Sequence, residues 1–192
     1  MVVFVVSSRA GNQISAFSIP KLSGHSSVDY CQVGSHCSLR HNNVGRMNEV
    51  IYTRCCIAGG GPAGVMLGFL LARMGIDVFV LEKHADFLRD FRGDTIHPST
   101  LEIMHELGIL DEFLKRPHQE IRELAGQVGQ DIVTIADFTH LPTHCRFLAF
   151  MPQWDFLDFI TERARRYSTF HLKMRSEVTD LIEEKGAVAG GT

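Results

Sequence analysis

The spacing of apolar residues along the chain changes repeatedly, and these changes predict alternating strands and helices. Residues 52–58 and 77–81 are short apolar runs rich in Val, Ile, Cys and Phe, as buried strands are. Between them, residues 62–74 repeat at helical spacing, and Pro62 stands where the first turn of a helix tolerates proline. The order predicts a β-α-β unit, which is typical of an α/β fold.

The pattern after this unit predicts further helices, a hairpin and two late strands. Residues 98–107 and 110–115 read as helices, since Gly108 ends the first and a proline follows the second. Two runs, 121–127 and 132–138, flank a turn at Gly129 and predict an antiparallel hairpin. Residues 154–167 return to helical period, and strands are expected at 170–174 and 177–182.

Residues 1–46 differ in character from the rest of the chain. They are rich in Ser, Gly, Asn and His and show neither helical nor strand period, so we expect a poorly ordered leader before a domain over 47–192. The leader has four basic residues and one acidic residue, a composition that a transit peptide shares with an over-extended start. A cytoplasmic location is expected, and an organellar one is the alternative.

Bulk composition excludes several functional classes. Residues 49–192 contain fifteen basic and twenty-one acidic residues, which gives no support for nucleic-acid binding. The five cysteines are irregularly spaced and do not form a disulfide framework. No apolar run approaches the roughly 20 residues of a membrane-spanning helix, so we expect no membrane span.

The first specific chemical signal is a glycine pattern between the first strand and the first helix. Gly59, Gly61 and Gly64 form G-x-G-x-x-G in the one context that makes this pattern informative. The glycines permit a tight turn, close approach of a pyrophosphate and close helix packing, and the positive end of the helix favours an anion. Glu82 follows at the end of the second strand, where an acid accepts hydrogen bonds from an adenosine ribose. This arrangement predicts a dinucleotide site but leaves FAD and NAD open.

Three longer segments carry a family resemblance that favours FAD. The runs "IAGGGPAGVMLGFLLARMGIDVFVLEKH", "RGDTIHPSTLEIMHELGILDEF" and "MPQWDFLDFITERARR" resemble the N-terminal half of the FAD-dependent aromatic monooxygenases, the para-hydroxybenzoate hydroxylase-like group. The resemblance implies a Rossmann-like FAD-binding domain with an antiparallel hairpin insertion, the start of a substrate domain, at about residues 121–150. It also implies NAD(P)H as co-substrate and hydroxylation of a small aromatic compound.

The resemblance assigns cofactor contacts to residues that are unremarkable by themselves. The expected FAD-binding set is Gly59, Gly61, Pro62, Ala63, Gly64, Glu82, Lys83, Arg92, Gln153 and Val178. In this set Arg92 contacts the diphosphate or ribitol, Gln153 opens the helix after the hairpin, and the backbone at Val178 meets the adenine. The family's later Asp-Gly and Gly-Asp segments do not occur, so we expect an incomplete chain that lacks full activity.

Alternatives to an oxidoreductase part remain open from sequence. A non-catalytic dinucleotide-binding fragment and an NAD-dependent dehydrogenase share the glycine pattern and Glu82. The spacing of Cys31, His36, Cys37 and His41 matches no familiar zinc finger, so no metal site is expected. No histidine has a Ser or Cys partner in a recognisable nucleophile motif, and the catalytic residues stay unknown.

Overall fold

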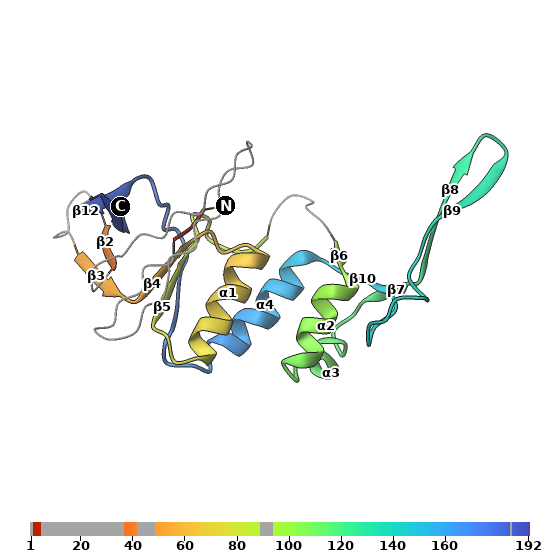
Figure 1. The fold of residues 1–192 in the computed structure, drawn as a ribbon, viewed down its shortest axis with the longest axis horizontal. Helices are drawn as coiled ribbons and strands as arrows, with labels where there is room; N and C mark the ends of the chain where they lie inside the picture. Colours follow the sequence, from red (N-terminus) through yellow and green to blue (C-terminus); the bar gives the residue numbers. More distant parts are fainter. Residues whose placement is uncertain (1, 5–36, 42–48, 89–93, 185) are drawn as a thin grey trace. The chain divides into compact units, whose positions relative to one another are not determined.

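The structure is a computed structural model that describes residues 2–4, 37–41, 49–88, 94–184 and 186–192 (Figure 1). The chain divides into two compact units, Met1–Phe87 with Ile160–Thr192, and Leu88–Phe159. The division falls within helix α4, Gln153–Ala164.

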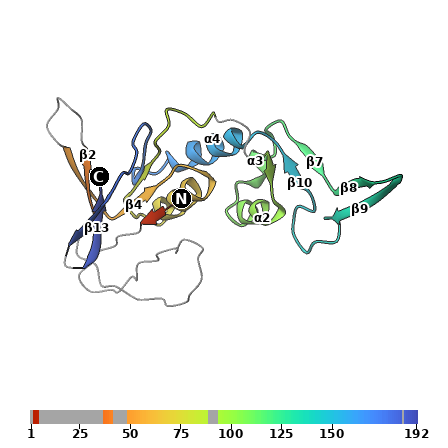
Figure 2. The same cartoon turned by 90° about the horizontal axis from the view of Figure 1, so that it is seen from above.

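The first unit contains the expected β-α-β arrangement. Strands β4 (Cys55–Ala58), β5 (Val78–Leu81) and β11 (Phe170–Lys173) are parallel, in the sheet order β1-β4-β5-β11. Helix α1 (Pro62–Arg73) connects β4 to β5 and buries Val65, Phe69 and Ala72. In Figure 2 the helix lies beside β4, in agreement with its contacts to β4, β5 and β11. The prediction of an α/β fold is confirmed.

The expected strand at 52–58 is two strands, β3 (Glu49–Thr53) and β4. The chain bends at Arg54, so that β3 joins a second sheet while β4 stays in the first. The buried Thr53 hydroxyl, 3.1 Å from the Asp77 carbonyl oxygen and 3.0 Å from its Oδ2, ties this bend to the residue before β5. Residues 52–58 are mostly apolar, so the sequence pattern did not indicate the break between β3 and β4, which the Thr53 hydrogen bonds stabilise.

The second sheet of the first unit has the order β12-β13-β2-β3. It contains β12 (Leu181–Glu184), β13 (Ala187–Gly191) and β2 (Cys37–His41), with only the β13-β2 pair parallel. The strand expected at 177–182 begins at Leu181 instead, because the preceding backbone bonds to residues 82–84 and to Thr192. Strand β13 was not expected from its small residues.

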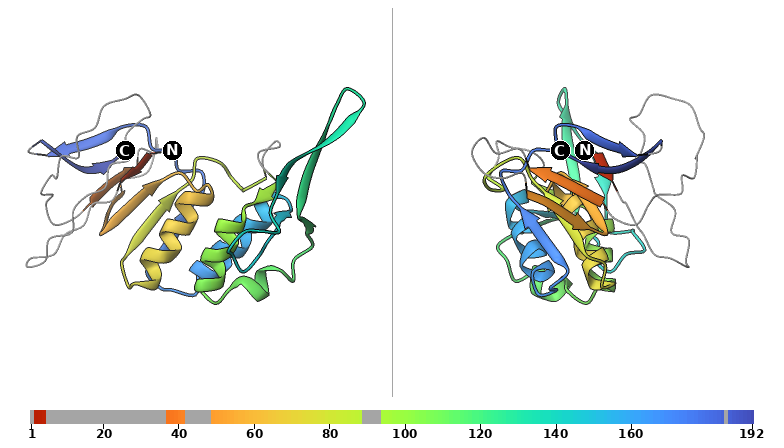
Figure 3. Two further views of the ribbon diagram at one scale, coloured as in Figure 1. Left: turned by 45° about the vertical axis from the view of Figure 1, so that its right-hand side comes forward. Right: turned by 90° about the vertical axis from the view of Figure 1, so that its left-hand side faces the viewer.

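Two segments of the expected leader pair into these sheets. Strand β1 (Val2–Phe4) runs antiparallel to β4, and β2 pairs with both β3 and β13 (Figure 3). Residues 5–36 and 42–48 lie outside the described part of the chain. The domain boundary near residue 47 stays a prediction.

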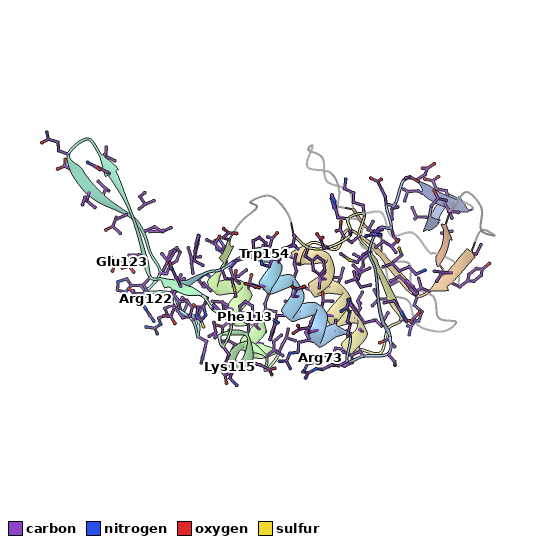
Figure 4. The ribbon with its side chains drawn as sticks, turned by 180° about the vertical axis from the view of Figure 1, so that it is seen from behind. Arg73, Phe113, Lys115, Arg122, Glu123 and Trp154 are labelled. Carbon is purple, nitrogen blue, oxygen red and sulfur yellow. The ribbon has the colours of Figure 1, made fainter. Side chains whose placement is uncertain are left out.

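The second unit has its own small sheet and helices. Strands β6 (Thr95–Ile96), β10 (Leu148–Phe150) and β7 (Gln119–Ile121) pair antiparallel in the order β6-β10-β7. Helices α2 (Pro98–Glu106) and α3 (Leu110–Phe113) are separated by Gly108, whose φ of 71° suits the end of a helix. Phe113, labelled in Figure 4, is fully buried and meets Phe156 edge-on at 5.9 Å.

The predicted hairpin is present as β8 (Glu123–Val128) and β9 (Asp131–Asp137). Gly129, with φ of 66°, lies in the turn, and a register shift occurs at Leu124 and Ala125. Arg122 and Glu123 mark the base of this hairpin in Figure 4. The guanidinium of Arg122 lies 5.4 Å from the centre of the Phe147 ring.

Candidate cofactor site

Residues 59–64 form a tight connection between β4 and α1, which we call the glycine corner. Gly59 has a φ of 111°, a conformation that side chains rarely adopt, and its N–H donates to the Leu81 carbonyl at 2.8 Å. The backbone at Gly59 is therefore still hydrogen-bonded to Leu81, the last residue of β5, before the chain turns sharply into α1. Gly61 is the N-cap of α1, and the first helical hydrogen bond runs from Val65 N–H to the Gly61 carbonyl at 2.9 Å.

Two glycines on α1 are required by close packing. A Cβ placed on Gly64 would lie 2.0 Å from the Gly59 carbonyl oxygen. One turn later, a Cβ on Gly68 would lie 2.7 Å from Val80 Cγ2 and 2.9 Å from Phe170 Cε2. The helix therefore approaches the sheet more closely than any side chain at these two positions permits.

Gly61 faces open space instead. A Cβ there would meet no atom within 4 Å, and the φ of −73° is ordinary for any residue. As a glycine, the N-cap Gly61 has no side chain to cap the helix, and the first turn of α1 contains no acidic residue. The amides of Ala63 and Gly64 precede the first helical bond and have no carbonyl within the helix to accept from them. This end of the helix can hold an anion.

The carboxylate of Glu82 points at the glycine corner. Glu82 is 5% exposed, and its Oε2 accepts from the Gly60 N–H at 2.9 Å. Its Oε1 accepts from the His84 N–H at 3.0 Å. A carboxylate oxygen can accept more than one hydrogen bond, which is the chemistry needed to bind a ribose hydroxyl. The structure therefore brings the glycine corner and Glu82 together, as the sequence predicted.

Gly60 and His84 are contributors that the sequence reasoning missed. A Cβ on Gly60 would lie 2.9 Å from Glu82 Cβ, so the middle glycine of the triplet makes room for the acid. The triplet itself was the available signal for Gly60. For His84 there was none, since its contribution comes from its backbone amide.

Lys83 and Val178 lie near Glu82 in the same unit. The exposed Lys83 ammonium is 3.8 Å from the Glu177 carboxylate, a surface pair worth little by itself. Val178 is half-buried against Cys56 and Leu81. Val178 precedes β12 and does not lie within a strand. Two residues before it, the Ser176 N–H donates to the Glu82 carbonyl at 2.8 Å, which holds this segment beside Glu82. Their contacts with a cofactor stay predictions.

The other two residues expected to contact FAD are Arg92 and Gln153, and the structure does not show either of them at the glycine corner. Arg92 lies outside the described residues. Gln153 is the first residue of α4 and belongs to the second unit; Figure 4 labels Trp154, the next residue of this helix. Both stay predictions.

Within the described ranges, no group of three His, Cys, Asp or Glu side chains is arranged to hold a metal ion. The same part of the chain has no helix that is long and apolar enough to cross a bilayer.

Known proteins match most of the chain. The FAD binding domain family matches residues 52–191. The chain is 30% identical over 140 residues to 6-methylpretetramide 4-monooxygenase of Streptomyces rimosus, covering 72% of this chain and 33% of that protein. It is 36% identical over 104 residues to 3-(3-hydroxy-phenyl)propionate/3-hydroxycinnamic acid hydroxylase of Escherichia coli K12, covering 52% of this chain and 18% of that one.

A solved structure shares the fold. The p-nitrophenol 4-monooxygenase of Pseudomonas putida DLL-E4 superposes with a TM-score of 0.59 at 22% identity, over 66% of this chain and 33% of that one. The chain thus spans about a third or less of the length of these relatives. With the family match over residues 52–191, these similarities confirm the expected resemblance: the chain belongs to the FAD binding domain family of the FAD-dependent aromatic monooxygenases.

Proposed function

We propose that the glycine corner and Glu82 bind the ADP half of FAD, and that this chain represents the cofactor-binding part of an aromatic hydroxylase. The observation that carries the proposal is the buried Glu82 carboxylate, which the Gly60 amide holds at 2.9 Å beside the bare backbone of Gly61. The residues fit the cofactor because they combine room for a pyrophosphate with an acceptor for a ribose hydroxyl.

Each group in the corner has a separate task in binding. Gly61 leaves space at the helix start, and the amides of Ala63 and Gly64 donate to the pyrophosphate. Pro62 removes an amide that would otherwise need a partner and presets the helix. Glu82 accepts from the ribose, while Lys83 and the backbone at Val178 line the adenosine end.

The bound FAD would supply electron acceptance from NAD(P)H and oxygen activation, and the protein supplies position and exclusion of water. Arg92 and Gln153 are proposed to contact the same cofactor nearer its flavin. The relatives named above are hydroxylases and monooxygenases, which supports a small aromatic substrate for the whole protein.

Titration of the 192-residue chain with FAD, followed by flavin fluorescence, tests the proposal. Gly61→Val places a branched side chain where the pyrophosphate approaches, and we expect affinity to fall at least tenfold, about 1.4 kcal/mol. Met74→Val introduces the same residue at the other end of α1, where Met74 is 75% exposed, and is the control. Unchanged FAD affinity in Gly61→Val, or binding of NAD without FAD, would overturn the assignment.

A further inference from the structure

The segment that follows strand β11 is held against the residue that carries the proposed ribose-binding acid. The Glu82 N–H donates to the Lys173 carbonyl at 2.9 Å, and the Ser176 N–H donates to the Glu82 carbonyl at 2.8 Å. Arg175 lies in the chain between these two bonds, and its own N–H donates to the His84 carbonyl at 2.9 Å. The backbone of Arg175 is therefore fixed beside Glu82.

Arg175 has a backbone conformation that residues with a side chain rarely adopt. Its φ is 55°, and it is the one residue other than glycine with a positive φ in the described part of the chain. Glycine is the usual residue for this conformation, because it has no Cβ to clash. Residues of this kind between the bonds of a ladder re-aim a side chain, and they cluster at ligand sites. The cost of placing an arginine here indicates a use for its side chain.

The guanidinium of Arg175 is available to a ligand. Two other cations belong to the same strand ends, and both have partners. The Lys83 ammonium lies 3.8 Å from the Glu177 carboxylate, and the Lys173 ammonium lies 5.9 Å from the centre of the Phe79 ring. The side chain of Arg175 is exposed and has neither an ion pair nor a ring contact among the described residues.

The order of the parallel strands determines which part of a dinucleotide comes next to Arg175. Strands β4, β5 and β11 are adjacent in that order, and ligands of such sheets bind outside the carboxyl ends of the strands. The glycine corner follows β4 and Glu82 follows β5, so the proposed pyrophosphate and ribose sites lie at these two ends. Neighbouring strands are about 4.8 Å apart. The next group along the ligand, the adenine, therefore reaches the end of β11, where Arg175 lies.

We propose that Arg175 stacks its guanidinium on the adenine of the bound nucleotide and thereby selects a purine base. A guanidinium is planar and stacks on aromatic faces, and a purine offers a larger face than a pyrimidine does. The contact rests on the proposed FAD function and adds a residue that recognises the base to Glu82, which binds the sugar.

Two nucleotide probes separate contact with the base from general attraction by a cation. ADP and UDP share the ribose and the diphosphate and differ in the base, and calorimetric titration of the 192-residue chain gives the affinity of each. Arg175→Gly accepts the positive φ and lacks the guanidinium. We expect this variant to lose about fivefold more affinity for ADP than for UDP. The loss of a positive charge alone would weaken both nucleotides equally, because both carry the same diphosphate.

Three further variants are matched to this comparison. Arg175→Asn also accepts a positive φ and should repeat the result of Arg175→Gly, which keeps the test open if one of the two fails to fold. Arg175→Lys keeps the charge without the planar group and should lose part of the preference for ADP. Glu82→Gln changes the contact with the shared sugar and should weaken ADP and UDP alike. Urea unfolding of each variant reports whether the fold survives.

The outcomes distinguish this contact from the function on which it rests. A parent chain that binds neither FAD nor ADP would overturn both. A parent chain that binds FAD, with ADP and UDP weakened equally or not at all in Arg175→Gly, would overturn the contact with adenine and leave the FAD assignment intact. A selective loss of ADP affinity in both Arg175→Gly and Arg175→Asn would support the contact.

Discussion

Substituting alanine at Gly64 and at Gly61 separates packing from ligand access within the glycine corner. At Gly64 a new Cβ would lie 2.0 Å from the Gly59 carbonyl oxygen and 3.3 Å from Ile57 Cγ2. The nearer atom belongs to the backbone and cannot rotate away, so the helix itself must move. At Gly61 a new Cβ meets nothing within 4 Å.

The expected loss for Gly64→Ala follows from these distances. Overpacking a close contact costs about 1–3 kcal/mol, and a backbone clash lies near the upper end. Alanine returns about 0.5–1 kcal/mol of that through its better helix propensity. We expect the free energy of unfolding to fall by about 2 kcal/mol. For Gly61→Ala, the poorer N-cap and the smaller entropy of the unfolded chain oppose each other, and we expect a change within about 0.5 kcal/mol.

Urea unfolding followed by circular dichroism measures both effects, and FAD titration completes the comparison. Gly64→Ala should lower stability, whereas Gly61→Ala should keep stability and weaken FAD binding. A stability for Gly64→Ala within about 0.5 kcal/mol of the parent chain would refute the close approach of helix and strand. A large loss of stability in Gly61→Ala would refute the open space at the helix start.

Three further predictions concern buried groups. Gly68→Ala should cost about 1–2 kcal/mol through its contact with Val80, and a double-mutant cycle by urea unfolding should show the cost reduced in a Val80→Ala background. Glu82→Gln turns one acceptor oxygen into a donor facing a backbone N–H, so we expect the free energy of unfolding to fall by about 1–3 kcal/mol in the same assay. Burial raises the pKa of the Cys145 thiol, so unfolding frees it to ionise, and stability should fall as pH rises above the ordinary thiol pKa; Cys145→Ala should lack this component when unfolding is measured against pH.

Local signals made the first unit's β-α-β arrangement predictable. Periodicity, Pro62 and the glycine spacing act within a few residues of each other, and the structure has α1 at Pro62–Arg73 against an expectation of 62–74. Glu82 was predictable for the same reason, because the end of a strand is fixed by the strand itself. What the sequence did not show was that the Gly60 amide holds the acid in place, since that contact spans 22 positions.

Long-range pairing accounts for most of what differed. Strands β1 and β2 lie in a stretch without periodicity, and their existence depends on the edges of β4, β3 and β13 that receive them. Val178 was expected within a strand, but the backbone before β12 is held by Glu82 and Thr192 instead. Hydrogen bonds between distant segments decide both outcomes, and apolar spacing carries no record of them.

The start of α1 carries no acidic residue in its first turn, and this favours the anionic ligand proposed for the glycine corner. A serine or aspartate at the N-cap would stabilise α1 by only about a few tenths of a kcal/mol more than Gly61 does. An acid in the first turn would also stabilise the helix, and that turn has none. Burial of the Glu82 carboxylate costs desolvation energy, and the hydrogen bonds from the amides of Gly60 and His84 offset part of this cost. A phosphate bonded to the helix amides would supply the negative charge that the first turn of α1 does not contain.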